Sequence, residues 1–420
     1  MPTISNISAR WILDSRGFPT VSCSVTLDQN GKKVTGSASV PSGASTGSHE
    51  ALELRDGGSA FGGKGVTKAV KNVNEGIASR ILRKEFSSAQ ELDEYLIQLD
   101  GTDTKTTFGA NATLAISEAA HRAFANLYGL ELWQYLRRLY FSELPATVTF
   151  PRIMCNILNG GAHADNSIDI QEFMLIPKTG NIEKDIQLCS EVYHQLKKNL
   201  LTQKEATAVG DEGGFAPNLG TMPQVLEYVN QAILDAKFTR EDCDLGLDAA
   251  ATEFYDSETD LYNVDSLSLT SSQLVDYYAQ VSKDYNILSI EDALSEDDIA
   301  GWSVLTEKMS EKSVLVGDDL FVTSTARFQT IAVEQKIANA ILIKPNQIGT
   351  ILETAKVINM AKVQNYKIAV SHRSGETSDS FISDLAFASQ ADFLKCGAPA
   401  RGERVAKYNR LLEILDSLVE

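Results

Sequence analysis

A repeated pattern in the C-terminal part of the chain places the strongest constraint on its fold. Short apolar runs alternate with longer stretches of helical character, and each run ends in a polar residue. After a first interval of 43 positions, these terminal residues recur every 23 to 28 positions; they are Asp248, Glu291, Asp318, Lys344, His372 and Lys395. A strand, a loop and a helix occupy about that length, and unbroken Ile, Leu and Val runs are typical of parallel strands buried on both faces. The pattern therefore predicts βα units that close a parallel barrel.

The N-terminal part follows a different pattern. Residues 21–27 alternate between apolar and small polar side chains, as expected of a half-buried strand, and Asn30-Gly31 is a strong hairpin signal. Helical spacing follows. We therefore predict a smaller α+β domain over residues 1–140, which caps a catalytic α/β barrel of the (β/α)8 type over residues 141–420.

Composition limits the classes of partner and the compartment. The net charge of −18 argues against nucleic acid as the main partner, because duplex binding draws its affinity from neutralised phosphates. The five cysteines have no zinc-ligand spacing, so we expect reduced thiols. Neither a leader pattern nor a run of eighteen apolar residues occurs, so we expect a cytoplasmic protein without a membrane span.

The carboxyl ends of barrel strands meet at one mouth, where active sites of this architecture are built. Asp248, Glu291 and Asp318 would form an all-oxygen cluster there, which is the ligand set that Mg²⁺ prefers. The cluster lacks cysteine, which makes zinc a poorer fit. Any one of these acids taken alone is as readily a helix N-cap; it is their convergence that indicates a functional site.

Two lysines, Lys344 and Lys395, stand on the same rim. A lysine beside a second cation and a metal has its ammonium form disfavoured, and it can then act as a base; each lysine alone is also a candidate salt-bridge partner for the acids. A base combined with divalent cations suggests removal of a proton next to a carboxylate. An ammonium at about 4 Å offers on the order of 4 kcal/mol at an effective dielectric constant of about 20. Enzymes lower barriers by about 8–23 kcal/mol, so cations acting as Lewis acids would supply much of the remainder.

Further motifs carry polar residues suited to an anion. SHRSGET places Arg373 beside Ser374 after a strand, and a guanidinium fork next to a hydroxyl suits a phosphate or a carboxylate; a surface turn is the alternative. His163 lies in the glycine-containing stretch NGGAHADN, and a histidine in such a stretch taken alone is more often structural than catalytic. Two acids are additional candidates; they are Glu172 in QEFML and Glu212 in VGDEGGFAPN.

Taken together, these motifs resemble the enolase family of bacterial type. The resemblance extends from the first strand nearly to the C-terminus, through LDSRGFPTV, VPSGASTGSHEALELRDG, NGGAHADN, QEFML, VGDEGGFAPNL, LGLDAAATEF, SIEDAL, VGDDLFVT, LIKPNQIGT, VSHRSGET and LKCGAPARGERVAKYN. It implies a homo-oligomeric glycolytic lyase, a homodimer or an octamer, that interconverts 2-phosphoglycerate and phosphoenolpyruvate with two Mg²⁺ per active site. The resemblance also implies a secondary association at the cell surface or with an RNA-degradation complex.

The resemblance also implies residue roles. Asp248, Glu291 and Asp318 would hold the first Mg²⁺, which takes the substrate carboxylate, and Ser45 would assist the second. Lys344 would remove the C2 proton. Glu212, together with Glu172, would help the C3 hydroxyl leave. Lys395 would bind the substrate carboxylate, and Arg373 and Ser374 would bind the phosphate. His163 and His372 would lie on closing loops.

Several neighbouring positions depart from the family pattern without replacing a group assigned to the chemistry; they are Phe18, Ser324, Pro345, Cys396 and Gly402. Pro345 favours an extended Lys344, which suits a strand end. Asp319 is interpreted as a support for the ligand Asp318, through contact with a lysine.

Three other functions remain open at this level. Another dehydratase or racemase of the same superfamily would not need a phosphate clamp such as SHRS. A barrel aldolase would use Lys344 as a Schiff base. An inactive paralogue with a binding role would not need to retain the acids and lysines.

Overall fold

The N-terminal part begins with a three-stranded antiparallel sheet in the order β1-β2-β3. The computed structural model describes residues 1–43, 49–145 and 147–418. The three strands are β1 (Thr3–Leu13), β2 (Pro19–Gln29) and β3 (Lys32–Ser39). Asn30 and Gly31 form the predicted hairpin turn with φ values of 55° and 85°. The alternating apolar residues of β2 are all buried, as predicted; they are Val21, Cys23, Val25 and Leu27.

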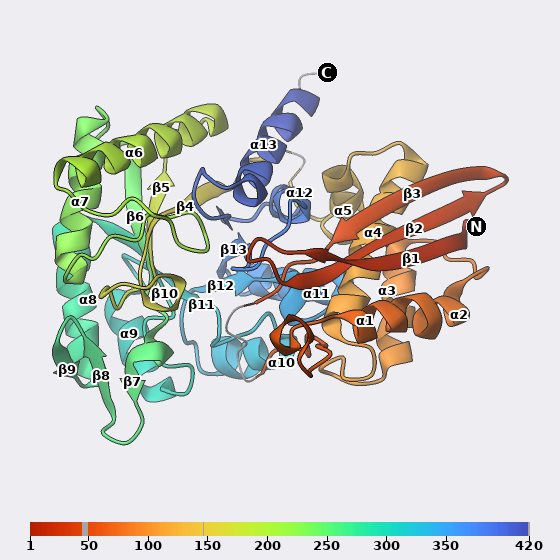
Figure 1. Cartoon of the computed structure of the whole chain (residues 1–420), viewed down its shortest axis with the longest axis horizontal. Helices are drawn as coiled ribbons and strands as arrows, with labels where there is room; N and C mark the ends of the chain where they lie inside the picture. The colour runs from red at the N-terminus through yellow and green to blue at the C-terminus, as the bar shows by residue number, and fades with distance from the viewer. Residues whose placement is uncertain (44–48, 146, 419–420) are drawn as a thin grey trace.

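Helices pack on this sheet and connect it to the barrel. They are η1 (Ala60–Gly63), α1 (Thr67–Lys71), η2 (Asn72–Ile77), α2 (Ala78–Ile81), α3 (Ala89–Asp100), α4 (Ala110–Tyr128) and α5 (Leu132–Tyr140). The predominantly buried helix α4 contacts β2 and β3 on one side and the barrel segments η6 (Pro345–Gln347) and α11 (Ile351–Val363) on the other. Figure 1 shows the sheet in red and these helices in orange beside the barrel.

The C-terminal part is a closed barrel of eight strands, as predicted. Around the barrel the strands are β4 (Arg152–Asn159), β5 (Glu172–Pro177), β6 (Cys243–Asp248), β10 (Ile287–Glu291), β11 (Val314–Gly317), β12 (Ala340–Ile343), β13 (Lys367–Ser371) and β14 (Phe393–Lys395). The expected all-parallel arrangement is wrong for one strand, since β5 runs antiparallel to both of its neighbours. The connection from β4 to β5 contains only the short turn η3 (Gly161–His163), whereas a parallel pair needs a longer crossover that is usually helical.

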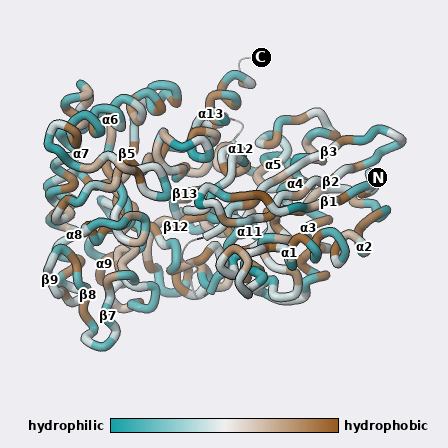
Figure 2. Tube along the Cα trace, viewed as in Figure 1, coloured by the Kyte–Doolittle hydropathy of each residue, from teal (hydrophilic) through white to brown (hydrophobic). Residues whose placement is uncertain are grey.

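Helices surround the barrel and cover the outward faces of its strands (Figure 1). Besides α11, they are α6 (Ile182–Thr202), α7 (Met222–Asp235), α8 (Ser271–Tyr285), α9 (Ile299–Met309), α10 (Thr325–Arg327) with η5 (Phe328–Glu334), α12 (Phe381–Ala388) and α13 (Gly402–Ser417). A short turn and a small sheet follow β6; they are η4 (Ala251–Phe254), β7 (Tyr255–Asp256), β8 (Leu261–Val264) and β9 (Leu267–Leu269). In Figure 2, helices α6 and α7 alternate between teal and brown, as expected of helices with one face on the barrel and one in solvent.

The barrel interior is apolar below its mouth. Residues from several strands form a separate buried cluster there; they are Met154, Met174, Ile176, Val314, Val316, Ala340, Leu342, Ala369 and Phe393. Their neighbours along each strand, such as Ile341 and Ile343 on β12, belong to the larger core that includes the helices. This explains why the strand sequences are apolar at every position, and it leaves the polar residues at the strand ends as the lining of the mouth.

Ion pairs and hydrogen bonds join the two parts of the chain. Arg122 on α4 pairs with Asp379 at 2.5 Å, and buried Lys105 pairs with Glu353 on α11 at 2.8 Å. The described part of the chain contains no helix with the length and apolar character needed to cross a membrane. All five cysteines are buried and free. The domain boundary at residue 140 stays a prediction.

Candidate active site

A polar cavity of about 320 Å³ opens at the carboxyl ends of the barrel strands. Among the residues that line it are ten of those predicted from the sequence; they are His163, Glu172, Glu212, Asp248, Asp318, Lys344, His372, Arg373, Ser374 and Lys395. Glu291 lies next to this lining and contacts Lys395. Ser45 lies outside the described residues.

The strand ends explain this convergence. Asp248, Glu291 and Lys395 are the last residues of β6, β10 and β14. Three more polar residues directly follow their strands; they are Asp318 after β11, Lys344 after β12 and His372 after β13. Glu172 is the first residue of β5, and because β5 is antiparallel to β6, its first residue pairs with Asp248 at the same end of the barrel.

Lys395 lies at the centre of a buried cluster of carboxylates. Its Nζ is 2.9 Å from Asp248 Oδ2, 2.8 Å from Glu291 Oε2 and 3.1 Å from Glu172 Oε1. Burial alone would lower the pKa of Lys395, but the three acids raise it well above its usual value. Burial raises the pKa of both Glu172 and Glu291. At Asp248 burial also acts to raise the pKa, but Lys395, His163 and Lys344 together lower it. One ammonium faces three acids, so the cluster is suited to a further cation.

Lys344 donates a hydrogen bond to Asp318 Oδ2. Burial alone would lower the pKa of Lys344, but Asp318 together with Glu291 raises it, and the net shift is upward. Lys344 is therefore an ammonium in this arrangement, and it must be released from Asp318 before it can act as a base. The lowered pKa expected for this lysine beside a second cation and a metal stays a prediction.

Asp292 is a functional candidate that the sequence reasoning missed. Its carboxylate accepts backbone N–H groups from Asp318 at 2.9 Å and from Asp319 at 3.0 Å, which orients the turn that carries both. Carboxylate oxygens of these three residues lie within 4.8 Å of one another, close enough to share a cation. Burial, with Asp318, raises the pKa of Asp319 to about 7. Lys344 lowers the pKa of Asp319 through its charge, while its hydrogen bond goes to Asp318. The support that Asp319 is expected to give Asp318 through a lysine stays a prediction.

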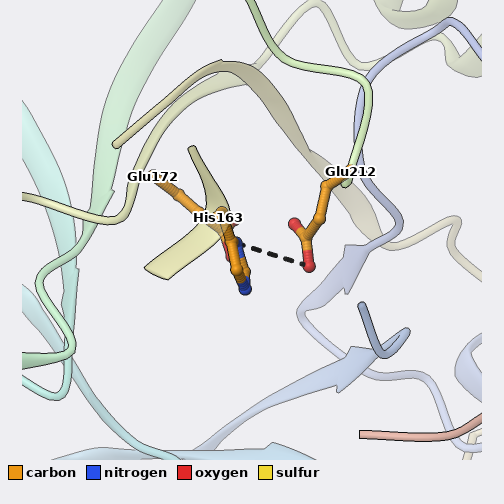
Figure 3. Close-up of side chains that lie close together, drawn as sticks. All are labelled: His163, Glu172 and Glu212. Atoms are coloured by element: carbon orange, nitrogen blue, oxygen red, sulfur yellow. Dashed lines mark ion pairs between the residues drawn. The ribbon is translucent and has the colours of Figure 1, made fainter. Parts of the chain in front are cut away.

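A second cluster contains His163, Glu172 and Glu212 (Figure 3). His163 Nδ1 lies 3.7 Å from Glu172 Oε1 and 3.9 Å from Glu212 Oε1, which are ion-pair rather than hydrogen-bond distances. Burial lowers the pKa of His163. Burial also raises the pKa of Glu172 well above its usual range, and nearby Glu212 adds to the effect. Of the two acids, Glu172 therefore retains a proton more readily.

His372 and its neighbours set the state of Glu212. Arg404 on α13 donates to His372 Nδ1 at 2.6 Å, so the ring proton is on Nε2, which faces Glu212 Oε2 at 3.1 Å. Asn156 also donates to Glu212 Oε2, at 3.1 Å. Burial would raise the pKa of Glu212, but His372, His163 and Arg404 together lower it well below its usual value, so Glu212 is held as a carboxylate. Burial lowers the pKa of His372 to about 4, which keeps the ring neutral near neutral pH.

Arg373 and Ser374, which the sequence predicts to bind an anion, both line the cavity. Arg373 makes a two-pronged pair with Glu50, with Nη1 at 3.0 Å from Oε2 and Nη2 at 3.3 Å from Oε1. Arg16, from the N-terminal part, donates to Ser374 Oγ at 3.4 Å. Neither Glu50 nor Arg16 was predicted from the sequence as a site residue, although both lie in the motifs LDSRGFPTV and SGASTGSHEALEL that carry the resemblance.

Two of the departures from the family pattern have a clear structural place. Lys344 is extended with φ −124° and ψ 103°, as Pro345 was predicted to favour, and Pro345 begins the turn η6. Ser324 caps α10 by accepting the N–H of Arg327 at 3.4 Å. Neither Pro345 nor Ser324 lines the cavity.

Comparison with known proteins agrees with this arrangement. Residues 4–136 match the family described as enolase, N-terminal domain, and residues 147–420 match enolase, C-terminal TIM barrel domain. A curated protein named enolase, from Natranaerobius thermophilus, is 48% identical over 420 residues, which cover 100% of this chain and 96% of that protein.

Proposed function

The chain belongs to the enolase family, and we propose that it interconverts 2-phosphoglycerate and phosphoenolpyruvate in glycolysis, as the carbon–oxygen lyase phosphopyruvate hydratase. The observation that carries the proposal is the convergence of Lys344 and Lys395 with a ring of carboxylates in one cavity, next to the arginine Arg373. This set can bind a doubly anionic substrate, remove a proton next to its carboxylate and protonate a leaving hydroxyl.

Asp248, Glu291 and Asp318 would hold a Mg²⁺ ion. Their oxygens are the donors that Mg²⁺ prefers, and the excess of buried negative charge around Lys395 fits a divalent cation. A cation bound there would neutralise the substrate carboxylate and compete with Lys344 for Asp318. The second Mg²⁺, assisted by Ser45, is proposed from the family resemblance alone.

Lys344 is the proposed base for the C2 proton. It lines the cavity at the end of β12, and its contact with Asp318 aims its Nζ toward the carboxylate cluster. Lys395, at the centre of that cluster, has the charge and position to hold the substrate carboxylate.

Loss of the C3 hydroxyl needs a proton donor. Glu172 and Glu212 both lie near Nδ1 of His163, and the pKa of Glu172 is raised while that of Glu212 is lowered. Two carboxyl groups whose environments push their pKa values apart are suited to share a proton, so we assign this step to the pair with His163 beside it. Arg373, Ser374 and neutral His372 would bind the phosphate end.

The oligomeric state and location are part of the same proposal. The resemblance implies a homodimer or an octamer, and β1 presents the exposed apolar side chains Trp11 and Leu13 next to Phe61, which are 47%, 55% and 46% exposed. The proposed substrate is an intermediate of glycolysis, which favours a cytoplasmic location. Light scattering of the purified protein measures the oligomer directly.

The activity is tested by following phosphoenolpyruvate through its ultraviolet absorbance after 2-phosphoglycerate is added, with and without Mg²⁺. Turnover should require Mg²⁺, and both Lys344→Ala and Asp318→Ala should abolish it. Lys197→Ala, on the exposed side of α6, is the matched control and should be as active as wild type. Full activity of Lys344→Ala would overturn the assignment of the base, and activity that survives a chelator together with borohydride trapping of the substrate would indicate an aldolase.

A further inference from the structure

A closed ring of hydrogen bonds lies behind the cavity and joins the proposed base to a proposed metal ligand. The backbone N–H of Lys344 donates to Thr323 Oγ1 at 2.9 Å, and Thr323 Oγ1 donates to Gln347 Oε1 at 2.7 Å. Gln347 Nε2 donates to Asp318 Oδ1 at 2.9 Å, and Lys344 Nζ closes the ring at Asp318 Oδ2. Thr323 and Gln347 are 0% and 2% exposed, and neither lines the cavity.

The direction of every hydrogen bond in the ring follows from the backbone N–H of Lys344, which is its first donor. A backbone N–H can only donate, so the oxygen of Thr323 must accept from Lys344. The single hydroxyl proton of Thr323 is then free to point to Gln347, which must present its amide oxygen. The amide nitrogen of Gln347 therefore faces Asp318, whose ionised carboxylate can only accept.

The backbone around Thr323 is held in an unfavourable conformation. Val322 and Thr323 have φ values of 44° and 52°, in the left-handed region that β-branched residues rarely adopt. Such a conformation persists only where surrounding contacts determine it. Here it places the hydroxyl of Thr323 between the strand end at Lys344 and the amide of Gln347.

Gln347 is also fixed through its backbone. Its N–H donates to the carbonyl of Lys344 at 2.9 Å, and its carbonyl accepts the N–H of Ala51 at 2.9 Å. A residue held on both sides loses little additional freedom when its side chain binds Asp318, so the amide is a rigid partner for that carboxylate.

We infer that Gln347 and Thr323 are positioning residues that commit one oxygen of Asp318 to the protein and leave the other, Oδ2, for a cation. The ring prevents Asp318 from turning both oxygens to Lys344, and it ties the orientation of the metal ligand to the strand end that carries the base. The inference rests on the proposed function, in which Asp318 binds Mg²⁺ and Lys344 is the base.

Breaking the ring at either residue should weaken Mg²⁺ binding. Thr323→Val keeps the shape of the side chain but removes the hydroxyl, which leaves Gln347 without its donor and the N–H of Lys344 without its acceptor. Gln347→Met keeps the length but removes the amide, which frees Asp318 Oδ1. Loss of a hydrogen-bonded neighbour of a metal ligand typically weakens metal binding about 10- to 100-fold.

The experiment measures Mg²⁺ binding to the full chain by calorimetry, without substrate. Both Thr323→Val and Gln347→Met should bind Mg²⁺ at least about tenfold more weakly than wild type, and kcat should fall more than KM changes when Mg²⁺ is saturating. Thr323→Ser keeps the hydroxyl and should retain wild-type Mg²⁺ affinity. Gln364→Met, an exposed residue after α11, is the matched control and should also bind Mg²⁺ normally.

The outcomes separate this inference from the proposed function. Wild-type protein that neither binds Mg²⁺ nor turns over 2-phosphoglycerate would overturn both. Wild-type affinity in folded Thr323→Val or Gln347→Met would overturn the ring's role and leave the activity intact. Should both variants fail to fold, a crystal structure of the wild type with Mg²⁺ decides: Asp318 bound to the ion through Oδ2, with Oδ1 still on Gln347, supports the inference, and Asp318 bound through both oxygens overturns it.

Discussion

Glu172, the first residue of β5, lies directly opposite Asp248, the last residue of β6, because these neighbouring strands run in opposite directions. Lys395 Nζ bridges the two at 3.1 and 2.9 Å and also contacts Glu291. The reversed strand thus adds a third carboxylate to a site that the parallel strands alone would supply with two. Among the described residues, Lys395 is thus the one ammonium that contacts all three of these buried carboxylates.

Lys395→Met should strongly destabilise the protein, because it leaves buried carboxylates without their cation. Removing one partner of a buried ion pair typically costs about 3–5 kcal/mol. Lys367→Met is a matched control, since Lys367 pairs with Asp392 at 3.1 Å but is 48% exposed, and its loss should cost under about 1 kcal/mol. Urea unfolding followed by circular dichroism measures both. An equal decrease in the free energy of unfolding in the two variants would show that Lys395 does not stabilise the carboxylate cluster.

Much of the site could be predicted from the sequence, because in a βα barrel the polar residues that end the repeated apolar runs are also the residues that line the active site. Each apolar run identifies a buried strand, and the polar residue that ends it must lie at the common mouth. This reasoning located Asp248 and Lys344 without any contact information. It did not locate β4 and β5, because these strands form an antiparallel pair rather than a βα unit and so fall outside the repeat.

Residues that act through others were missed for a different reason. Arg404 sets the tautomer of His372 from a helix 32 positions away, and nothing in the sequence near either residue indicates the contact. Gln347 likewise reaches Asp318 across 29 positions. Asp292 did have a local signal, since it follows Glu291 in SIEDAL, but its role depends on the backbone of the next strand end.

Gly36→Ala should destabilise the packing of α4 on β3 within the N-terminal part. A Cβ at Gly36 would lie 2.2 Å from the carbonyl oxygen of Ala119 in α4, so β3 and α4 would have to separate. Overpacking of this kind typically costs about 1–3 kcal/mol. Gly402→Ala is the control, because nothing lies within 4 Å of its Cβ position, and it should change the free energy of unfolding by less than about 0.5 kcal/mol. Thermal denaturation compares them; an unaffected Gly36→Ala would contradict the close approach.

His121 should make the protein less stable in mild acid. It is fully buried in α4, hydrogen-bonded to the carbonyl of Ser117 and to Tyr140, and burial lowers its pKa from 6.5 to about 4. The unfolded chain therefore binds a proton at higher pH than the folded one, so the contribution of neutral His121 is present above pH 6.5 and is lost as the pH falls toward 4. A shift of this size corresponds to about 3 kcal/mol.

The check is the free energy of unfolding measured by urea between pH 7 and pH 4. The free energy of unfolding should change less with pH in His121→Gln than in the wild type. In His194→Gln, which alters an exposed histidine on α6, its pH dependence should match the wild type. A slope in His121→Gln that matches the wild type would mean that other groups cause the acid sensitivity.

Arg373→Lys should weaken substrate binding more than it slows turnover. The guanidinium of Arg373 makes two parallel contacts with Glu50 at 3.0 and 3.3 Å, a geometry that a phosphate can adopt and that a lysine cannot reproduce. We expect KM for 2-phosphoglycerate to rise about tenfold or more, with a smaller change in kcat. Arg240→Lys, an exposed arginine after α7, controls for the substitution itself and should leave both constants unchanged. Because the charge is kept, an unaltered KM in Arg373→Lys would mean that the fork geometry contributes nothing and that the phosphate is held elsewhere in the cavity.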